Sequence, residues 1–554
     1  MTPLLLTVAL GLLGHAQNTS TPDLAGGRAL LRSGAFEDAE ELLREIVDGD
    51  DSNDAAWMLL GQALRAQERF DEALEGFERA SETQTLAGRA GFFAGCMYAQ
   101  LGDFETARAR IEKAVAAGFQ DRPLLTQVPE LEELRKDPRL LALIPPLLEG
   151  AAAFAEEPRI LHTFIGEAPG DQFGWVARPV GDLDGDGVTD FASTSPTYAG
   201  GKGRVYVYSA KSGELLFTLD GRSGWNLGMS VAGEVDINGD GTPDVLAGAP
   251  APAGAPGHAI VASGRDGSIL FEVTASEMGD GFGTKVCGIQ DLNGDGCDEL
   301  VVSAMRADAE GQDSGRVYVY SGKDAGLMFQ IDGPAAGDLF GSSADATHSG
   351  DHNLLIVGAM GTSGGGRALV YRCDEDGAEL HFTIDPDETG TNLGQYFATV
   401  LGDVDGDGTP DLYASDWNNA AKGPATGRVY VHSGANGDRL LTITGQVAGE
   451  GFGTSAAVCG DVNGDGSADL AIGAWQHSSG APSGGKVYLH SGKDGSLLSA
   501  WTSLQAGDTL GFDAVGLGDV DGDGAADYLL TSAWSAVRGP RTGRVFVVAG
   551  PRLE

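Results

Sequence analysis

Two hydrophobic periodicities divide this chain. From about Leu24 to Ala117 the apolar residues recur with the spacing of amphipathic helices. Beyond residue 158 they alternate with polar residues, as in the run Val205 to Tyr208, which is typical of half-buried strands. We therefore expect a multidomain protein: an all-α region at residues 22–120, a helical cap and linker at 121–157, and an all-β domain at 158–554.

The helical region repeats itself every 34 residues. Phenylalanines recur at this spacing, and an alanine follows each of them three positions later: Phe36, Phe70 and Phe104, with Ala39, Ala73 and Ala107. These spacings resemble the tetratricopeptide repeat, a helix-turn-helix unit whose small residues let paired helices approach closely. The resemblance implies a solenoid whose groove holds a peptide or a partner protein. A plain helical spacer remains the alternative.

The β region is organised around a short acidic loop, first seen at Asp182 to Asp190. Oxygen-bearing side chains stand at positions one, three, five and nine of this loop, and glycines at positions four and six allow a tight turn. A Ca²⁺ ion takes six to eight oxygen ligands at about 2.3–2.6 Å. Alternate residues of a curled loop can supply them, with the backbone carbonyl of position seven completing the set.

Six copies of this loop occur. Their expected metal ligands, with position seven contributing its carbonyl, are Asp182, Asp184, Asp186, Val188 and Asp190; Asp236, Asn238, Asp240, Thr242 and Asp244; Asp291, Asn293, Asp295, Cys297 and Glu299; Asp403, Asp405, Asp407, Thr409 and Asp411; Asp461, Asn463, Asp465, Ser467 and Asp469; and Asp519, Asp521, Asp523, Ala525 and Asp527. An EF-hand carries its last acid at position twelve and leads into a helix, whereas here the acid stands at position nine and a β-rich run follows. We therefore expect hairpin loops that hold up to six structural Ca²⁺ ions.

The spacing of these loops reveals seven repeats. They recur every 54 to 58 residues, apart from one gap of 112, and a degenerate copy without the ligand pattern fills that gap at Asp345 to Asp351. Each repeat also has a Phe-Gly or Leu-Gly dipeptide near its start, as at Phe173, except that the fifth departs from the pattern, and most have a strand that opens with a cation, as at Arg316. This combination resembles the FG-GAP repeat of integrin-α-like proteins. The resemblance implies a seven-bladed β-propeller with four strands in each blade.

The two ends of the β region complement each other. The seventh repeat stops without a fourth strand, and a copy of that strand, Arg159 to Phe164, precedes the first repeat. A closed ring leaves no exposed sheet edge, which open sheets have to protect. We therefore predict that residues 159–165 complete blade seven.

A candidate ligand site lies in the loops on the other side of the blades from the acidic loops. The last three repeats carry a tryptophan at matching positions, Trp417, Trp475 and Trp534. Aromatic rings beside amides suit sugar rings or the side chains of a partner protein. The alternative, which we favour, is that these tryptophans wedge between adjacent blades.

Composition and the N-terminus indicate the compartment. The net charge is −44, which argues against nucleic acid as a partner. Met1 to Ala16 reads as a secretory signal, and no later segment is apolar enough for a transmembrane span. The five cysteines are scattered; a Cys287–Cys297 bridge is a further alternative. We expect a secreted, periplasmic or cell-surface protein.

The sequence names no reaction. It carries no HExxH and no Gly-x-Ser-x-Gly motif before a helix, and no recurrent base accompanies the acidic loops, so no catalytic residue is predicted. The favoured interpretation is a non-enzymatic calcium-binding adhesion or interaction protein, whose propeller binds a protein or glycan and whose helical repeats dock a partner. The alternatives are a polysaccharide lyase or hydrolase built on the propeller and a purely structural envelope component.

Overall fold

The computed structural model describes residues 22–83, 86–119, 122–144, 148–252, 254–349 and 352–551. The chain divides into two compact units, Met1–Leu147 and Leu148–Glu554. The secretory signal predicted at residues 1–16 lies outside the described residues. None of the helices in the part that the structure describes combines the length and the hydropathy needed to span a bilayer.

The first unit is a stack of helix pairs. Its helices are α2 (Pro22–Ser33), α3 (Phe36–Gly49), α4 (Asp54–Ala66), α5 (Phe70–Ala80), α6 (Ala87–Gln100) and α7 (Phe104–Ala116). The three recurrent phenylalanines each begin the second helix of a pair, and the three alanines that follow them are fully buried. The 34-residue period is therefore one helix-turn-helix unit, as predicted.

Small residues set the distance between paired helices. A Cβ atom on Gly61 of α4 would lie 2.8 Å from the ring of Phe77, and one on Gly76 of α5 would lie 3.0 Å from the carbonyl oxygen of Trp57. Both approaches are closer than a side chain allows, so α4 and α5 can pack this tightly only because glycine occupies these positions.

Shorter helices follow the repeats. These are α8 (Arg122–Gln127), η2 (Pro129–Leu131), η3 (Leu134–Lys136) and α9 (Pro138–Leu141). Arg65 of α4 donates a hydrogen bond to Glu130 of η2 at 2.6 Å, and both side chains are buried. A buried charge is tolerated when it is paired in this way, so the pair fastens the irregular segment to the repeats.

The second unit is a seven-bladed β-propeller, as predicted. Within the described residues its strands form seven four-stranded antiparallel sheets. In chain order the blades are β2–β5 (Ala177–Gly181, Asp190–Ser195, Arg204–Tyr208, Leu215–Asp220), β6–β9 (Ser230–Val235, Asp244–Ala249, Pro256–Ala262, Ile269–Met278), β10–β13 (Phe282–Ile289, Glu299–Ala304, Arg316–Tyr320, Leu327–Asp332), β14–β17 (Phe340–Ser349, His352–Ala359, Arg367–Asp374, Gly377–Ile384), β18–β21 (Ala398–Val400, Leu412–Asp416, Arg428–His432, Arg439–Thr444), β22–β25 (Phe452–Val458, Leu470–Ala474, Lys486–His490, Leu497–Thr502) and β26–β28 (Ala514–Gly518, Asp527–Ser532, Arg544–Val548) with β1 (Ile160–Ile165). First strands of neighbouring blades contact one another, as β2, β6, β10 and β14 do in succession, so these strands surround the axis.

Blade four shows why one repeat lacks an acidic loop. There β14 and β15 stay paired as far as Ser349 and His352. In the other six blades an acidic loop interrupts this pairing. A hairpin that closes by direct strand pairing has no curled segment in which alternate residues can converge. The degenerate repeat is thus a complete blade without a cation loop.

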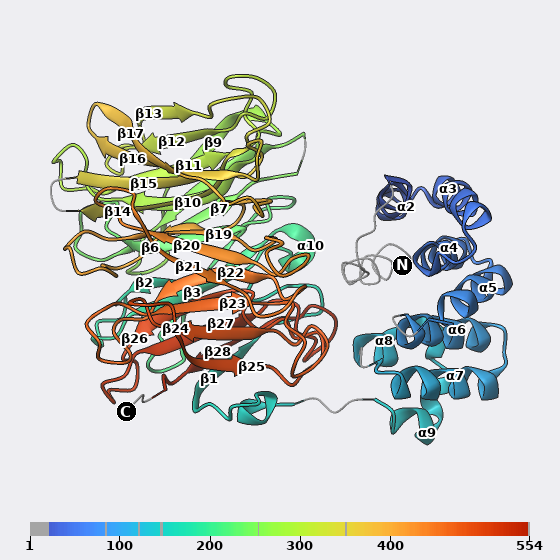
Figure 1. Cartoon of the computed structure of the whole chain (residues 1–554). Helices are drawn as coiled ribbons and strands as arrows, with labels where there is room; N and C mark the ends of the chain where they lie inside the picture. The colour runs from blue at the N-terminus through green and yellow to red at the C-terminus, as the bar shows by residue number, and fades with distance from the viewer. Residues whose placement is uncertain are drawn as a thin grey trace. The chain divides into compact units, whose positions relative to one another are not determined.

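The ring is closed by its own first strand. β1 pairs antiparallel with β28, with Phe164 opposite Val545, and Figure 1 shows the early strand β1 beside the late strand β28. The ring of Phe164 also lies 5.3 Å from that of Phe191 and 4.5 Å from that of Tyr208, both in blade one. This strand therefore completes blade seven and packs it against blade one.

Residues before β1 also belong to the propeller. The segment expected to be a helical cap and linker, residues 121–157, ends with the short helix η4 (Gly150–Ala153) and with Phe154, whose ring lies 5.1 Å from that of Phe546. Glu156 accepts hydrogen bonds from the backbone N–H and the hydroxyl of Thr502, at 2.6 and 2.8 Å. A composition of small residues and acids resembles a linker, but here one aromatic ring and one carboxylate anchor it.

The recurrent cations, which open the third strand of every blade except blade two, act within the propeller. Arg204 pairs with Asp220 and Glu167, and Arg316 pairs with Asp332. In blade seven Arg544 is almost fully buried, and its Nη2 donates to Asp508 Oδ2 at 2.5 Å. These cations therefore pair with carboxylates of the propeller itself.

Closure by β1 leads to a stability prediction. Phe164→Ala removes a half-buried ring from the contact between blades seven and one, and we expect it to lower the free energy of unfolding by about 2 kcal/mol, somewhat less than a fully buried Phe→Ala change of roughly 3–5 kcal/mol. Denaturant unfolding of the whole chain measures the change. Thr163→Ala, at an exposed position of the same strand, is the control, and equal losses for the two variants would contradict the role of the ring.

Candidate metal loops and the aromatic face

The first carboxylate of each acidic loop organises the backbone. In loop one, Asp182 Oδ1 accepts hydrogen bonds from the N–H groups of Gly185 at 2.8 Å and Asp186 at 3.1 Å, and its Oδ2 accepts one from Gly187 at 2.9 Å. Gly185 and Gly187 have φ of 78° and 84°, a left-handed conformation that glycine adopts without strain. The Asp-x-Asp-Gly-Asp-Gly pattern therefore encodes a curled loop directly.

The remaining ligand positions are held in the same curl. The backbone N–H of position seven donates to the carboxylate of position five in all six loops, at 2.7 to 3.1 Å: Val188, Thr242, Cys297, Thr409, Ser467 and Ala525 are the donors. Position nine begins the second strand of the blade or immediately precedes it, and its carboxylate accepts backbone hydrogen bonds, as Asp190 does from Leu183 at 2.9 Å. Each loop thus presents carboxylates from both sides of one turn.

Three of the loops bring carboxylates close enough to share an ion. The groups Asp182, Asp184 and Asp190; Asp403, Asp405 and Asp411; and Asp519, Asp521 and Asp527 each place ligand oxygens within 4.8 Å of one another. The other three loops have an asparagine at position three, which can contribute a carbonyl oxygen instead. Asn293 donates from its Nδ2 to Glu299 at 3.2 Å, so its amide already faces the position-nine acid.

Burial makes the ionised form of the position-nine acids unfavourable in the absence of a cation. The six position-nine acids are completely buried. Burial, with further repulsion from neighbouring carboxylates, raises the pKa of Asp190, Asp244 and Asp411 to about 6 and that of Glu299 to about 8. A divalent cation bound among the oxygens would favour the ionised forms and reverse this shift.

Basic side chains already approach several loops. Lys211 donates to the backbone carbonyl of Asp186 at 2.9 Å, and Lys493 donates to that of Asp465 at 3.1 Å. Both lysines come from the tight turn between the third and fourth strands of their blade. At the acidic loop of blade seven, Arg159 pairs with Asp521 and, at 2.8 Å, with Asp523. These cations offset part of the loop charge. The Ser-Gly-Lys-Asp turn was the sequence signal for Lys493, whereas Lys211 stands in a Ser-Ala-Lys-Ser turn.

The three predicted tryptophans meet on one face. The ring centroids of Trp417 and Trp475 are 6.5 Å apart, and those of Trp475 and Trp534 are 5.0 Å apart. All three side chains are partly buried. They therefore pack across the boundaries of blades five, six and seven, and each of them remains partly exposed.

Three further aromatic residues extend this group. Phe512 lies 5.7 Å from Trp475 and 4.9 Å from Trp175, and Tyr396 lies 6.3 Å from Trp417. We call the six rings of Trp175, Tyr396, Trp417, Trp475, Phe512 and Trp534 the aromatic face. The three added residues each follow a Phe-Gly or Leu-Gly dipeptide by one or two positions, a signal that sequence reasoning missed.

A buried hydrogen-bond group anchors the loop that carries Trp475. His477 Nδ1 lies 2.7 Å from Glu450 Oε2, and the hydroxyl of Tyr488 donates to the same oxygen at 2.8 Å. Burial acts to raise the pKa of Glu450, but the hydrogen bonds from His477 and Tyr488 outweigh it and leave the pKa below its ordinary value. The Trp475 ring therefore projects from a rigid loop.

The cysteines play no covalent part in either region. All five are buried, and none of them forms a disulfide. Cys287 and Cys297 are accordingly not bridged, and Cys297 contributes only its backbone to loop three, where its N–H bonds to Asp295 at 3.1 Å.

This combination of seven blades, acidic hairpin loops and a helical prefix has counterparts among known repeats. Residues 173–208, 227–261, 282–320 and 452–490 match the FG-GAP repeat, and residues 24–85 match the tetratricopeptide repeat. The chain therefore carries FG-GAP repeats in a seven-bladed β-propeller that follows tetratricopeptide-type helical repeats.

Individual relatives agree with this assignment. Integrin alpha-V of Gallus gallus is 30% identical over 224 residues, which cover 35% of this chain and 20% of that protein. Integrin alpha-E of Mus musculus is 36% identical over 172 residues, covering 27% of this chain and 15% of that protein. Phosphatidylinositol-glycan-specific phospholipase D of Bos taurus is 27% identical over 220 residues, covering 31% of this chain and 26% of that protein. The chain thus spans about a quarter or less of the length of these relatives.

Proposed function

We propose that this chain is a non-enzymatic, extracytoplasmic interaction protein whose propeller is stiffened by Ca²⁺ and binds a protein or glycan through the aromatic face. The helical repeats would dock a second partner. The observation that carries this proposal is the continuous group of six partly or largely exposed aromatic rings across blades five, six, seven and one. The similarity to integrin alpha chains supports an adhesion or interaction role.

The aromatic face suits a ligand with flat apolar surfaces and polar edges. Exposed aromatic groups of this kind are uncommon on surfaces without partners and are enriched where binding energy is concentrated. Trp417 Nε1 donates to Gln395 at 2.9 Å, and the neighbouring Asn418 also presents an amide. Rings beside amides can stack on a sugar ring while bonding its hydroxyls, or receive apolar side chains of a protein.

The proposed metal role is structural. Oxygen-only donor sets of carboxylates, amides and a backbone carbonyl suit a hard cation such as Ca²⁺. At about 1 mM free Ca²⁺, a site with a Kd of about 0.1 mM adds about 1.4 kcal/mol to folding stability. Six independent sites would add at most about 8 kcal/mol, which is comparable with the stability of a whole domain.

Metal removal tests this role. We expect EDTA to lower the melting temperature of the propeller by on the order of 10 °C, because the clustered carboxylates lose their counter-ions. Isothermal titration of the metal-free chain with CaCl₂ should count up to six sites, and Asp403→Asn should remove one of them. Asp438→Asn, an exposed aspartate outside the loops, is the matched control. An unchanged melting temperature together with no calcium uptake would refute the proposal.

The stabilising effect of calcium should depend on pH. Four of the position-nine acids, Asp190, Asp244, Asp411 and Glu299, have pKa values of about 6 to 8 in the folded, metal-free chain and of about 4 when unfolded. The folded state therefore holds more protons than the unfolded state in this interval, and metal-free stability falls as the pH rises from about 4 through 8. Calcium binds the ionised form, so the gap in melting temperature with and without Ca²⁺ should widen from pH 5 to pH 8. A gap of constant size would contradict the involvement of these acids.

The aromatic face is tested by binding. Trp475→Ala removes its central ring, and we expect affinity for a ligand found on a glycan array or in an extracellular protein panel to fall at least tenfold, equivalent to about 1.4 kcal/mol. Met278→Ala, at a position 71% exposed in blade two, should leave affinity unchanged, and thermal unfolding should show both variants folded. Equal binding by the two variants would place the ligand elsewhere. Ligand turnover abolished by Trp475→Ala would favour the hydrolase or lyase alternative.

A further inference from the structure

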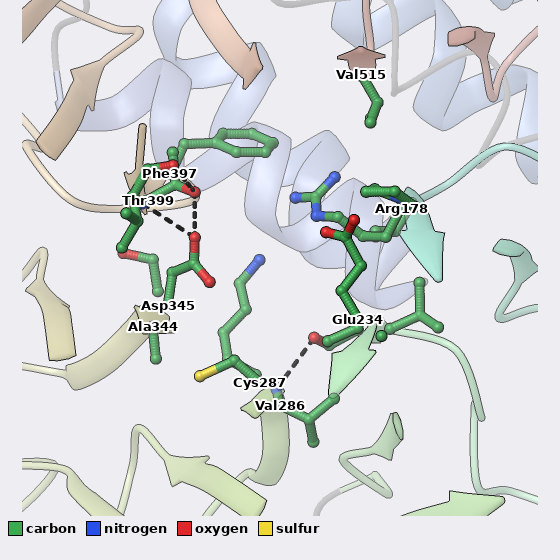
Figure 2. Close-up of a pocket in the computed structure, with 18 of the residues that line it drawn as sticks. Arg178, Glu234, Val286, Cys287, Ala344, Asp345, Phe397, Thr399 and Val515 are labelled. Carbon is green, nitrogen blue, oxygen red and sulfur yellow. Dashed lines mark hydrogen bonds between the residues drawn. The ribbon is translucent and has the colours of Figure 1, made fainter. Parts of the chain in front are cut away.

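A cavity of about 460 Å³ lies among the first strands of the propeller. Four charged residues line it, each from a different blade: Arg178 of β2, Glu234 of β6, Lys285 of β10 and Asp345 of β14. Figure 2 shows Arg178, Glu234 and Asp345 around this space, with Phe397 and Thr399 on one side. Its volume is within the range of small-molecule sites, roughly 300–1,000 Å³.

Two of the four charges are already engaged by the protein. Arg178 Nη1 pairs with Asp513 Oδ2 at 2.7 Å. Asp345 accepts hydrogen bonds from the hydroxyl of Thr399 and, at 3.0 Å, from the backbone N–H of Val400. These interactions fix the cavity walls and hold Asp345 and the Nη1 atom of Arg178 in place.

Lys285 has no such engagement. Among the described residues its ammonium makes no ion pair or hydrogen bond, and its one specific contact is with the ring of Phe397, 5.6 Å from the ring centroid. Burial, reinforced by the charge of Arg178, lowers the pKa of Lys285 to about 8. The half-buried Lys285 ammonium therefore faces the cavity without a carboxylate partner from the protein, and a bound carboxylate could supply one.

Glu234 is its counterpart. The pairing of β6 with β7 shifts register between Ala232 and Val235, and Glu234 takes a φ of 62° in this bulge. A left-handed conformation is uncommon for a residue other than glycine and often marks a functional position. The side chain is exposed to the cavity and, among the described residues, makes no hydrogen bond or ion pair.

We propose that the central cavity binds a small carboxylic acid that also carries hydroxyl or ammonium groups, with its carboxylate on Lys285 and a donor group on Glu234. Phe397 and the aliphatic wall supply the apolar contact. Arg178 and Lys285 face Glu234, Asp345 and Asp513, so a ligand with one carboxylate and further donor groups fits better than a polyanion such as phosphate. Tyr396 lines the cavity and also belongs to the aromatic face, so the two sites adjoin.

Calorimetric titration of the full calcium-bound chain tests this site. One arm uses a sugar acid, D-glucuronate, and a second uses an amino acid, L-serine; D-glucose and inorganic phosphate are the comparison ligands. We expect one site per chain for at least one of the two acids, weakened at least tenfold by Lys285→Met and by Glu234→Gln. Lys202→Met, at an exposed lysine outside the cavity, should bind like the parent chain. The acid that binds shows whether the cavity prefers a sugar acid or an amino acid.

Separate readouts distinguish a binding role from a structural one. Without ligand, Lys285→Met should melt at the same temperature as the parent or higher, because the lost ammonium has no protein partner; a lower temperature would indicate a structural role. Affinity should fall as the pH rises above about 8, where Lys285 loses its proton. No binding of either acid, or equal affinity in Lys285→Met, would overturn the proposal. Trp475→Ala should leave this binding intact, so the cavity and the aromatic face can fail independently.

Discussion

The propeller depends on the pairing of β1 with β28. A sheet edge exposes unpaired backbone groups that can pair with other chains. A series of blades that does not close would leave such an edge unprotected at each of its two ends. The chain removes both by placing the last strand of blade seven ahead of blade one, so that closure covers β28 and brings Phe164 against Phe191 and Tyr208. Every site described above draws on more than one blade or on the rigidity of the closed ring.

The two sides of the blades carry different chemistry for a geometrical reason. Loops between the first and second strands contain the acidic curls, whereas loops between the second and third strands carry Trp417, Trp475 and Trp534. Antiparallel strands reverse direction at each turn, so these two loop sets emerge at opposite ends of the blade. The proposed calcium ions would therefore stiffen one end of the ring while ligands approach the other.

Much of the architecture was readable from local pattern. The 34-residue helical period, the acidic loops and their spacing, the degenerate fourth repeat and the closing strand are each properties of short segments, because turn geometry and strand alternation depend on residues within about ten positions of each other. The loop ligands could be predicted from the sequence for the same reason. Glycines at positions four and six allow the curl that brings alternate side chains together. The contacts of Phe154 and Glu156 could not be predicted from the sequence, because their partners Phe546 and Thr502 lie more than 300 residues away.

The sequence alone determined the repeats, their number and the residues of each acidic loop. The loop residues follow from the pattern inside one repeat, and the number of repeats follows from the spacing of the loops along the chain. Only the tertiary structure decided which side chains from different repeats meet. Trp175 meets Phe512, and Lys285 and Glu234 come to face one cavity, because the packing of the blades in a ring brings together positions more than fifty residues apart. No periodicity along the chain encodes such convergence; it follows from the number of blades and the radius at which their first strands pack.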